Sequence, residues 1–253
     1  MIMQTAERSS VLDPSEHVIY NRCLFAYEVS KPAAKGAVIE LGSGEGYGIR
    51  LLAPSAQKYL AIDKFEPVLQ AEGNIEFRKL MLPSLAGIPD NSFDTAITFQ
   101  VIEHIKNDRE FVAEIFRVLK KGGKLIVTTP NRLMSLTRNP WHIREYTGQE
   151  LADVLSSKFG DVTLKGVYGN EKVMQYYLKN KESVRKIMKY DVLNLQYVLP
   201  RRVLQIPYDI MNRLNRRRLQ KSNESLVSDV TVKDFILKDY DNQAFDIYAV
   251  ATK

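Results

Sequence analysis

The sequence contains very little cysteine, histidine or tryptophan. Among its 253 residues there are one cysteine, three histidines and one tryptophan. A single thiol, Cys23, excludes a disulfide or a cluster of thiolate ligands within the chain, and a reducing cytosol suits such a chain. The first ten residues lack the apolar stretch of a secretory signal, and no apolar run approaches the ~20 residues of a membrane-spanning helix. We therefore expect a cytoplasmic protein, with the inner face of the membrane as a second candidate location.

Positive charge is concentrated in one segment of the chain. The formal net charge is +6, yet residues 171–220 alone hold 12 Lys and Arg against 4 Asp and Glu, which makes that segment +8 and the remainder −2. The composition is otherwise ordinary for a globular protein, with 45% hydrophobic and 26% charged residues. The basic segment therefore needs an explanation of its own.

Short apolar runs alternate with helical patterns along most of the chain. Strands are expected at 37–41, 58–63, 75–80, 93–99, 124–129, 161–169 and 245–252. Helices are expected at 13–30, at 107–120 up to Gly122 and Gly123, and at 147–159 behind a capping box of Thr147 and Glu150. This alternation predicts an α/β protein with a Rossmann-like, seven-stranded, mostly parallel sheet and helices on both faces.

The spacing of the last two strands differs from the rest. About 75 residues separate them, so we expect an antiparallel final strand that follows a helical insertion. The chain is thereby divided into an N-terminal helical cap (1–36), a core (37–169), a basic helical insertion (170–243) and a last core strand (244–253).

Residues 38–48 read VIELGSGEGYG, a strand pattern that runs into glycines at alternate positions. A dinucleotide-binding loop requires G-x-G-x-x-G at the start of a helix. Neither register is met, because the third glycine would have to stand at Tyr47 or Ile49. The carboxylate of Glu40, just before the first glycine, would also repel a diphosphate. The loop therefore favours a ligand with a positive centre.

A second carboxylate stands where a ribose would be held. Asp63 ends the second predicted strand, and a carboxylate at that place accepts hydrogen bonds from both ribose hydroxyls. A ligand with a ribose, a positive centre and no phosphate is S-adenosylmethionine.

The loop resembles the first motif of class I S-adenosylmethionine-dependent methyltransferases, E/D-x-G-x-G-x-G. The resemblance continues through 61–63 (AID), 88–105 (IPDNSFDTAITFQVIEHI) and 117–132 (RVLKKGGKLIVTTPNR), in the order of that family's motifs. Within the family, the chain looks most like methyltransferase type 11 and ubiquinone-biosynthesis enzymes. The resemblance implies S-adenosylmethionine as cofactor and S-adenosylhomocysteine as product.

The resemblance also assigns residues to the cofactor. It implies that the methionyl part is cradled by Glu40, Gly42, Ser43, Gly44 and Gly46. Asp63 would bind the ribose with Lys64 beside it, and Phe99 and Gln100 would flank the cofactor. Many family members place an acidic residue near the adenine, where this chain has Met81 and Leu82. Apolar contact and backbone bonds would then hold the adenine.

Histidines and a glutamate mark the predicted acceptor side. Methyl transfer to a hydroxyl needs a base, whereas an amine needs only to be neutral. Glu103 and His104 follow the fourth strand and His142 follows the fifth, so we predict catalytic or substrate-contacting roles for all three. The alternative is that Glu103 and His104 only stabilise the following helix.

The same residues bear on metal binding. In ubiquinone-biosynthesis O-methyltransferases and small-RNA 2′-O-methyltransferases, an E-x-x-E-H motif and a later histidine bind a divalent cation. Gln100 replaces the first glutamate here, which removes one anionic ligand. We therefore predict no metal in the site.

The loop NPWHIREYT (139–147) contains Trp141, Arg144 and Tyr146. It provides either a stacking wall and a cation for an acceptor or packing of the loop on the sheet. The stretch looks loosely like methyltransferases encoded among bacterial surface-glycan functions.

The basic insertion has several interpretations. It can be a lid over an anionic acceptor, a contact with an anionic membrane through 198–220, a nucleic-acid surface, or a helical cap with a solvated basic face. We predict methyl transfer to oxygen of a small-molecule or glycan acceptor. The alternatives are an RNA 2′-O-methyltransferase and a cofactor-binding protein without turnover, although we do not expect a nucleic-acid partner. The oligomeric state is not indicated.

Overall fold

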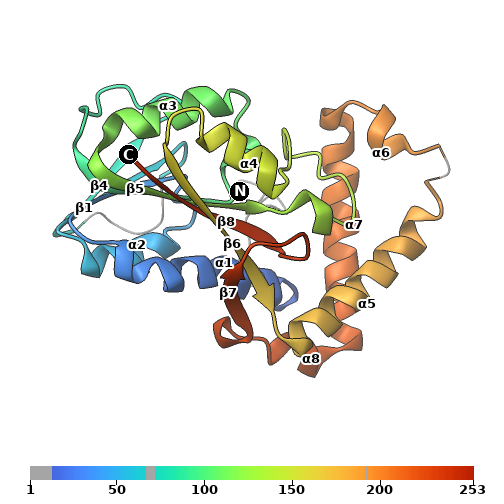
Figure 1. Ribbon diagram of the computed structural model, residues 1–253. Helices are drawn as coiled ribbons and strands as arrows, with labels where there is room; N and C mark the ends of the chain where they lie inside the picture. The colour runs from blue at the N-terminus through green and yellow to red at the C-terminus, as the bar shows by residue number, and fades with distance from the viewer. Residues whose placement is uncertain (1–12, 67–71, 192) are drawn as a thin grey trace.

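An eight-stranded sheet runs through the computed structural model, which describes residues 13–66, 72–191 and 193–253. In these residues the sheet order is β3-β2-β1-β4-β5-β8-β6-β7 (Figure 1). The strands are β1 Ala37–Leu41, β2 Lys58–Asp63, β3 Ile75–Lys79, β4 Phe93–Phe99, β5 Leu119–Pro130, β6 Asp161–Gly169, β7 Phe235–Asp239 and β8 Asp246–Thr252. The α-helices are α1 His17–Ser30, α2 Tyr47–Leu52, α3 Asp108–Val118, α4 Gly148–Leu155, α5 Glu171–Met188, α6 Leu195–Val198, α7 Arg201–Ser222 and α8 Glu224–Ser228. Residues 1–12 of the predicted cap, which include the stretch examined for a signal, lie outside the described residues.

The strand pairing confirms a mostly parallel sheet with an antiparallel final strand. Strands β1 to β5 pair in parallel, and β8 is antiparallel to both β5 and β6. The chain order reverses between β1 and β4, which are neighbours in the sheet. Ligands of open α/β sheets bind outside the carboxyl ends of the strands at such a switch point. The loop after β1 and the residues after β4 lie there.

The predicted number of strands, seven, was one too few. Strand β7 pairs antiparallel with β6 at the edge of the sheet. Its sequence FILKD has one buried residue, Phe235, so it lacks the apolar run by which the central strands are recognised. The segment 170–243 therefore contains a strand as well as helices, and its last α-helix ends at Ser228.

The junction between α3 and β5 also differs from the prediction. The helix ends at Val118, and β5 begins at Leu119, so Gly122 and Gly123 lie inside the strand rather than behind the helix. Leu119 is fully buried in an extended conformation and pairs with Phe93 before the register shifts. Burial of that side chain outweighs continuation of the helix.

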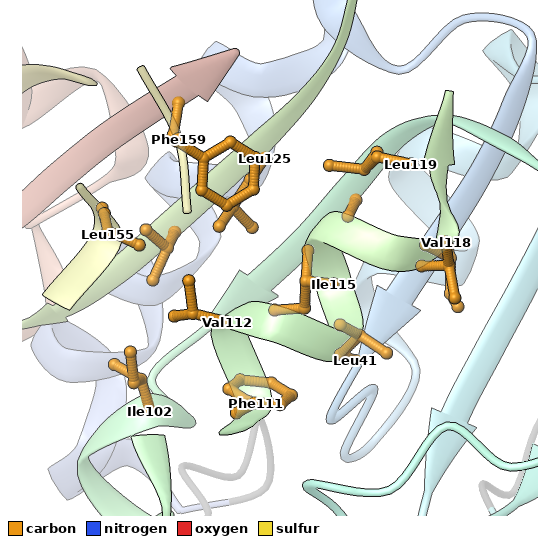
Figure 2. Close-up of a cluster of buried hydrophobic side chains, with 14 of the residues drawn as sticks. Leu41, Ile102, Phe111, Val112, Ile115, Val118, Leu119, Leu125, Leu155 and Phe159 are labelled. Atoms are coloured by element: carbon orange, nitrogen blue, oxygen red, sulfur yellow. The ribbon is translucent and has the colours of Figure 1, made fainter. Parts of the chain in front are cut away.

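Two apolar layers cover the two faces of the sheet. Helices α3 and α4 lie on one face, and α1 and α2 on the other (Figure 1). Figure 2 shows how Phe111, Val112 and Ile115 of α3 point into the sheet beside Leu41 and Leu125. Each such buried side chain stabilises the fold by about 1.5–3 kcal/mol. The capping box of Thr147 and Glu150 at the start of α4 is present as predicted.

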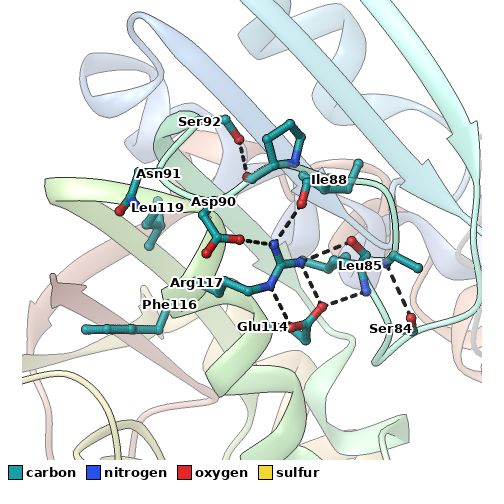
Figure 3. A network of polar contacts seen from close by, with 12 residues as sticks. Ser84, Leu85, Ile88, Asp90, Asn91, Ser92, Glu114, Phe116, Arg117 and Leu119 are labelled. Carbon is teal, nitrogen blue, oxygen red and sulfur yellow. Dashed lines mark hydrogen bonds and ion pairs between the residues drawn. The ribbon is translucent and has the colours of Figure 1, made fainter.

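A single arginine fixes the loop that leads into β4. The Arg117 guanidinium of α3 donates to the carbonyls of Leu85 and Ile88 and to the carboxylates of Asp90 and Glu114 (Figure 3). These acceptors hold the pKa of Arg117 above its usual range. The cation thus clamps the chain just before the strand whose end carries the predicted site.

Helices α5, α6 and α7 form an arm beside the sheet, drawn in orange in Figure 1. Buried Asn215 of α7 accepts a hydrogen bond from Ser183 and donates one to Asn180, which joins α7 to α5. The Trp141 indole donates to Asp209 at 2.9 Å and thereby ties α7 to the loop after β5. None of the described helices has the length and apolarity needed to cross a membrane.

Candidate active site

The glycine loop follows β1 closely and presents a small open cradle. The backbone amides of Gly42 and Ser43 donate to the carbonyl of Ile62, which fixes the loop against β2. A Cβ at Gly42 would overlap Val101. Gly44 has φ +51, and a Cβ at this residue would meet no atom within 4 Å, so the loop is open here.

Asp63 joins the end of β2 to this loop. Its Oδ2 accepts the Gly44 amide at 2.9 Å, and its Oδ1 accepts the Phe65 amide at 3.0 Å. The carboxylate is buried. A backbone donor on each oxygen fixes the orientation of the carboxylate beside the cradle.

Glu40 is held by two tyrosines that the sequence did not reveal. Its oxygens accept from Tyr27 of α1 and Tyr59 of β2, each at 2.8 Å. Burial raises the pKa of Glu40 to about 7, although the two tyrosine hydrogen bonds act in the opposite direction. Glu40 thus lies beneath the loop as the centre of a buried polar group, and its predicted contact with the cofactor ammonium stays a prediction.

Strained backbone marks the end of β4. Gln100 has φ +56, a left-handed conformation that is uncommon for residues other than glycine. The backbone amide of Gln100 donates to the carbonyl of Thr128. The preceding Phe99 packs edge-to-face on Tyr27, with ring centroids 4.9 Å apart. Strain of this kind is concentrated at functional sites, and here it turns Gln100 out of the sheet at the switch point.

Of the other residues predicted to bind the cofactor, Gly46 lies in the glycine loop, Lys64 follows β2, and Met81 and Leu82 follow β3. Lys64 is exposed, with its ammonium 5.3 Å from the ring centroid of Phe65. Met81 is 70% exposed, whereas Leu82 packs against the core. The assignment of Gly46, Lys64, Met81 and Leu82 to the cofactor stays a prediction.

The residues around the cradle fit S-adenosylmethionine. Within the described residues, the Ser43 hydroxyl is buried and has no hydrogen-bond partner. It lies in the same loop as the open position at Gly44, next to the Asp63 carboxylate. A buried unpaired hydroxyl costs about 1–3 kcal/mol, which a polar ligand would recover. This donor and acceptor set suits an amino acid group and a ribose.

A cavity of about 750 Å³ lies between the sheet and the arm. Gln100, Glu103, His104 and His142 line one end of it. The remainder is formed by α1, the loop after β5, and helices α5 to α7, with mostly apolar side chains such as Tyr176. The structure thus brings the predicted acceptor-side residues together, and it adds an apolar chamber that sequence reasoning missed.

Glu103 occupies the polar end of the cavity with one unpaired oxygen. Its Oε2 accepts from the Thr129 hydroxyl at 2.9 Å, while Oε1 is buried without a partner in the described residues. Burial raises the pKa of Glu103, and the charges of His104 and His142 act against that rise. A carboxylate with a raised pKa is a stronger base than an ordinary carboxylate.

The two histidines are oriented by their neighbours. The side-chain oxygen of Asn139 accepts a hydrogen bond from the backbone amide of Trp141. The side-chain NH2 of Asn139 therefore faces His142 Nε2 and donates a hydrogen bond to it. His142 Nδ1 therefore carries the proton and donates to Glu145 at 2.7 Å. His104 Nδ1 donates to the Trp141 carbonyl at 3.1 Å, which leaves Nε2 as its basic nitrogen.

Three of these residues also form a potential ligand set for a cation. Glu103, His104 and His142 each offer one atom, and these atoms lie within 4.8 Å of one another. Both ring nitrogens of His142 already have partners, Glu145 and Asn139. A metal ion bound there would have to displace one of them. The prediction of no metal stays a prediction.

Trp141, Arg144 and Tyr146 pack within the protein, whereas Asn139, His142 and Glu145 of the same loop line the cavity. Arg144 and Tyr146 both donate to Asp108 at the start of α3, and burial raises the pKa of Tyr146. Trp141 donates to α7.

Arg22 and Asp246 form an ion pair of 3.1 Å beside Glu103, and no local motif indicated it.

Comparison with known proteins agrees with this geometry. Residues 39–127 match the family model described as a methyltransferase domain. A "Probable S-adenosylmethionine-dependent methyltransferase" of Mycolicibacterium smegmatis is 38% identical over 129 residues, which cover 47% of this chain and 50% of the relative. The bovine "Ubiquinone biosynthesis O-methyltransferase, mitochondrial" is 23% identical over 191 residues, 70% of this chain and 46% of the relative. The chain thus spans about half the length of the curated relatives it matches.

A solved structure extends the similarity to nearly the whole chain. An S-adenosylmethionine-dependent methyltransferase from Archaeoglobus fulgidus superposes with a TM-score of 0.54 at 16% identity, over 94% of each chain. At that identity the match shows a shared fold.

The strand order, the glycine loop and the carboxylate after β2 define the class I methyltransferase fold. Together with the family match and the named relatives, they identify residues 39–127 as a methyltransferase domain of the class I type, for which S-adenosylmethionine is the cofactor.

Proposed function

We propose that the chain transfers a methyl group from S-adenosylmethionine to a hydroxyl of an amphiphilic small molecule. The observation that carries this proposal is the 750 Å³ cavity, which has a polar end at the switch point and an apolar body. A polar head would lie at Glu103, and an apolar tail would lie between α5 and α7. A free glycan would leave much of that apolar lining without contact.

The residues at the polar end support transfer to oxygen. S-adenosylmethionine, when bound, supplies a methyl group activated by a sulfonium. Glu103 Oε1 accepts a hydrogen bond from the acceptor hydroxyl, and either Glu103 or His104 Nε2 removes its proton. Glu145 holds His142 at the wall of the cavity. The ubiquinone-biosynthesis relative is named as an O-methyltransferase, which agrees with a hydroxyl acceptor.

Formation of S-adenosylhomocysteine with a panel of acceptors tests the proposal. The panel contains a hydroxyaromatic with an alkyl tail, the same head group without the tail, a free glycan and a short RNA. We expect turnover with the tailed acceptor and a higher KM without the tail. Salt-sensitive RNA binding together with turnover of RNA alone would contradict the proposal.

The variant Glu103→Gln separates chemistry from binding. It keeps the size of the side chain but removes the base, so kcat should fall about a hundredfold. Affinity for S-adenosylmethionine, measured by calorimetry, should stay at the wild-type value. An unchanged kcat would remove Glu103 from the reaction.

A further inference from the structure

Exposed apolar side chains gather on the arm. In the described part of the chain, ten of the fifteen large exposed apolar residues lie between positions 190 and 214. Four of them, Val203, Ile206, Ile210 and Leu214, follow each other at three- or four-residue intervals along α7 and share one face. We call these four residues the apolar face of α7. A contiguous exposed face of this kind marks an interaction surface rather than ordinary scatter.

The connection before α7 extends this surface. Tyr190 is 89% exposed, and Leu193, Tyr197 and Val198 are also largely exposed. Figure 1 shows α6 at one end of α7, well away from the sheet. The exposed apolar residues therefore run along one side of the arm and across its tip.

Helix α7 also borders a cationic groove. It has a volume of about 640 Å³ between α5 and α7, and its charged lining consists of Lys179, Lys186, Lys189, Arg218 and one carboxylate, Glu182. Tyr190 and Met211 line both this groove and the large cavity. Four cations against one carboxylate suit an anionic head group next to an apolar phase.

We propose that the apolar face of α7 and the cationic groove dock this protein on the surface of an anionic lipid membrane. The apolar side chains would enter the boundary between head groups and acyl chains, and the lysines and Arg218 would contact the phosphates. The distribution of charge carries the choice of partner. Helix α7 holds seven Lys and Arg against one Asp, so a second copy of this face would meet like charge.

The position of the large cavity agrees with this partner. Leu195, Val203 and Met211 are exposed and also line the cavity, so the cavity opens within the docking surface. An amphiphilic acceptor could then pass from the lipid phase to Glu103 without crossing water. This last step rests on the proposed function, whereas docking itself does not.

Flotation with lipid vesicles tests the docking. Vesicles of phosphatidylcholine alone are compared with vesicles that also contain phosphatidylglycerol. We expect binding to the anionic vesicles that weakens as salt rises. The triple variant Ile206→Asn, Ile210→Asn and Leu214→Asn, whose residues lie outside the cavity lining, should lose at least tenfold in partitioning. Ile236→Asn, an exposed apolar residue on β7, is the matched control and should bind as wild type.

The cationic groove is tested separately. Lys186→Gln, Lys189→Gln and Arg218→Gln should each weaken binding about fivefold, and Lys158→Gln near α4 should not. Retained affinity for S-adenosylmethionine shows that each variant is folded. Absence of wild-type binding to anionic vesicles, or a dimer that the triple variant dissolves, would overturn the proposal. Turnover of a detergent-dispersed acceptor is scored independently, so failure of docking and failure of the proposed function are distinguishable.

Discussion

The central sheet and the helical arm differ in how they use their apolar residues. Strand β1 buries four of its five residues and β4 six of seven. In contrast, α5 buries two of 18 residues and α7 two of 22. The sheet is stabilised by contacts within the chain, whereas the arm leaves a large apolar surface in solvent. The proposed amphiphilic acceptor and the proposed membrane would each cover part of this exposed apolar surface.

The cofactor and the acceptor are likewise expected to bind to different parts of the molecule. The cofactor cradle is built from the glycine loop and Asp63, which are local features at the ends of β1 and β2. The acceptor cavity is assembled from segments between residues 18 and 245. Substitutions at the ends of the sheet strands should therefore change the affinity for the cofactor, and substitutions in the arm should change the affinity for the acceptor.

The largest expected effect comes from breaking the cradle. Gly44→Val places a β-branched residue at φ +51 and fills the open position, so binding of S-adenosylmethionine should be lost while the protein stays folded. Calorimetry measures the binding, and circular dichroism the fold. Gly160→Val, at another open glycine, is the control and should bind normally. Wild-type affinity in Gly44→Val would move the cofactor elsewhere.

His142 tests the acceptor side with the cofactor side unchanged. His142→Ala removes the ring between Glu145 and Asn139, so turnover should fall about a hundredfold while cofactor affinity changes little. Steady-state kinetics and calorimetry measure the two quantities. His17→Ala at the start of α1 serves as control. Unchanged turnover with the true acceptor would remove His142 from the mechanism.

The pKa of Glu40 predicts a pH-dependent stability of the sheet. Between its ordinary pKa of 4.5 and its folded value of about 7, the folded protein keeps a proton that the unfolded chain has released. The free energy of unfolding should therefore fall as pH rises through this window, by on the order of 3 kcal/mol, and then level off. Glu40→Gln should remove that decline in urea titrations. Glu40→Ala is a poorer test of cofactor binding than Gly44→Val, because it would leave the buried hydroxyls of Tyr27 and Tyr59 without their hydrogen-bond acceptor.

Substitution of Asn215 should destabilise the arm alone and have the smallest effect. Asn215→Ala leaves Ser183 and Asn180 without their buried partner, which costs about 1–3 kcal/mol. Hydrogen exchange should accelerate in α5 and α7 and stay unchanged in β1 and β4. Gln220→Ala in the same helix is the control. Equal acceleration in the sheet would show that the arm and the sheet unfold as one unit.

The sequence was sufficient for the parts that depend on neighbouring residues. The central strands, the antiparallel last strand and the capping box of Thr147 could be predicted because apolar runs and capping residues act over a few positions. Strand β7 could not, because an exposed edge strand carries little apolar pattern. The end of α3 at Val118 was decided by the burial of Leu119 in tertiary packing.

The residues of the candidate site also differ in whether the sequence could predict them. The glycine loop and Asp63 are motifs and were found at once. The tyrosines that hold Glu40 come from α1 and β2, and Glu145 and Asn139 orient His142 only after the loop has folded. No spacing in the sequence encodes such contacts. The arm was predicted as basic and helical, but its apolar face needed the exposure of each side chain.

A crystal structure with S-adenosylhomocysteine and a tailed acceptor would show whether the cofactor and the acceptor bind in the two places proposed. We expect the cofactor in the cradle between Gly44 and Asp63, its sulfur facing Gln100 and Glu103, and the acceptor in the cavity between the sheet and the arm. Cofactor density inside the cavity between α5 and α7, or an acceptor bound away from Glu103, would contradict this expectation.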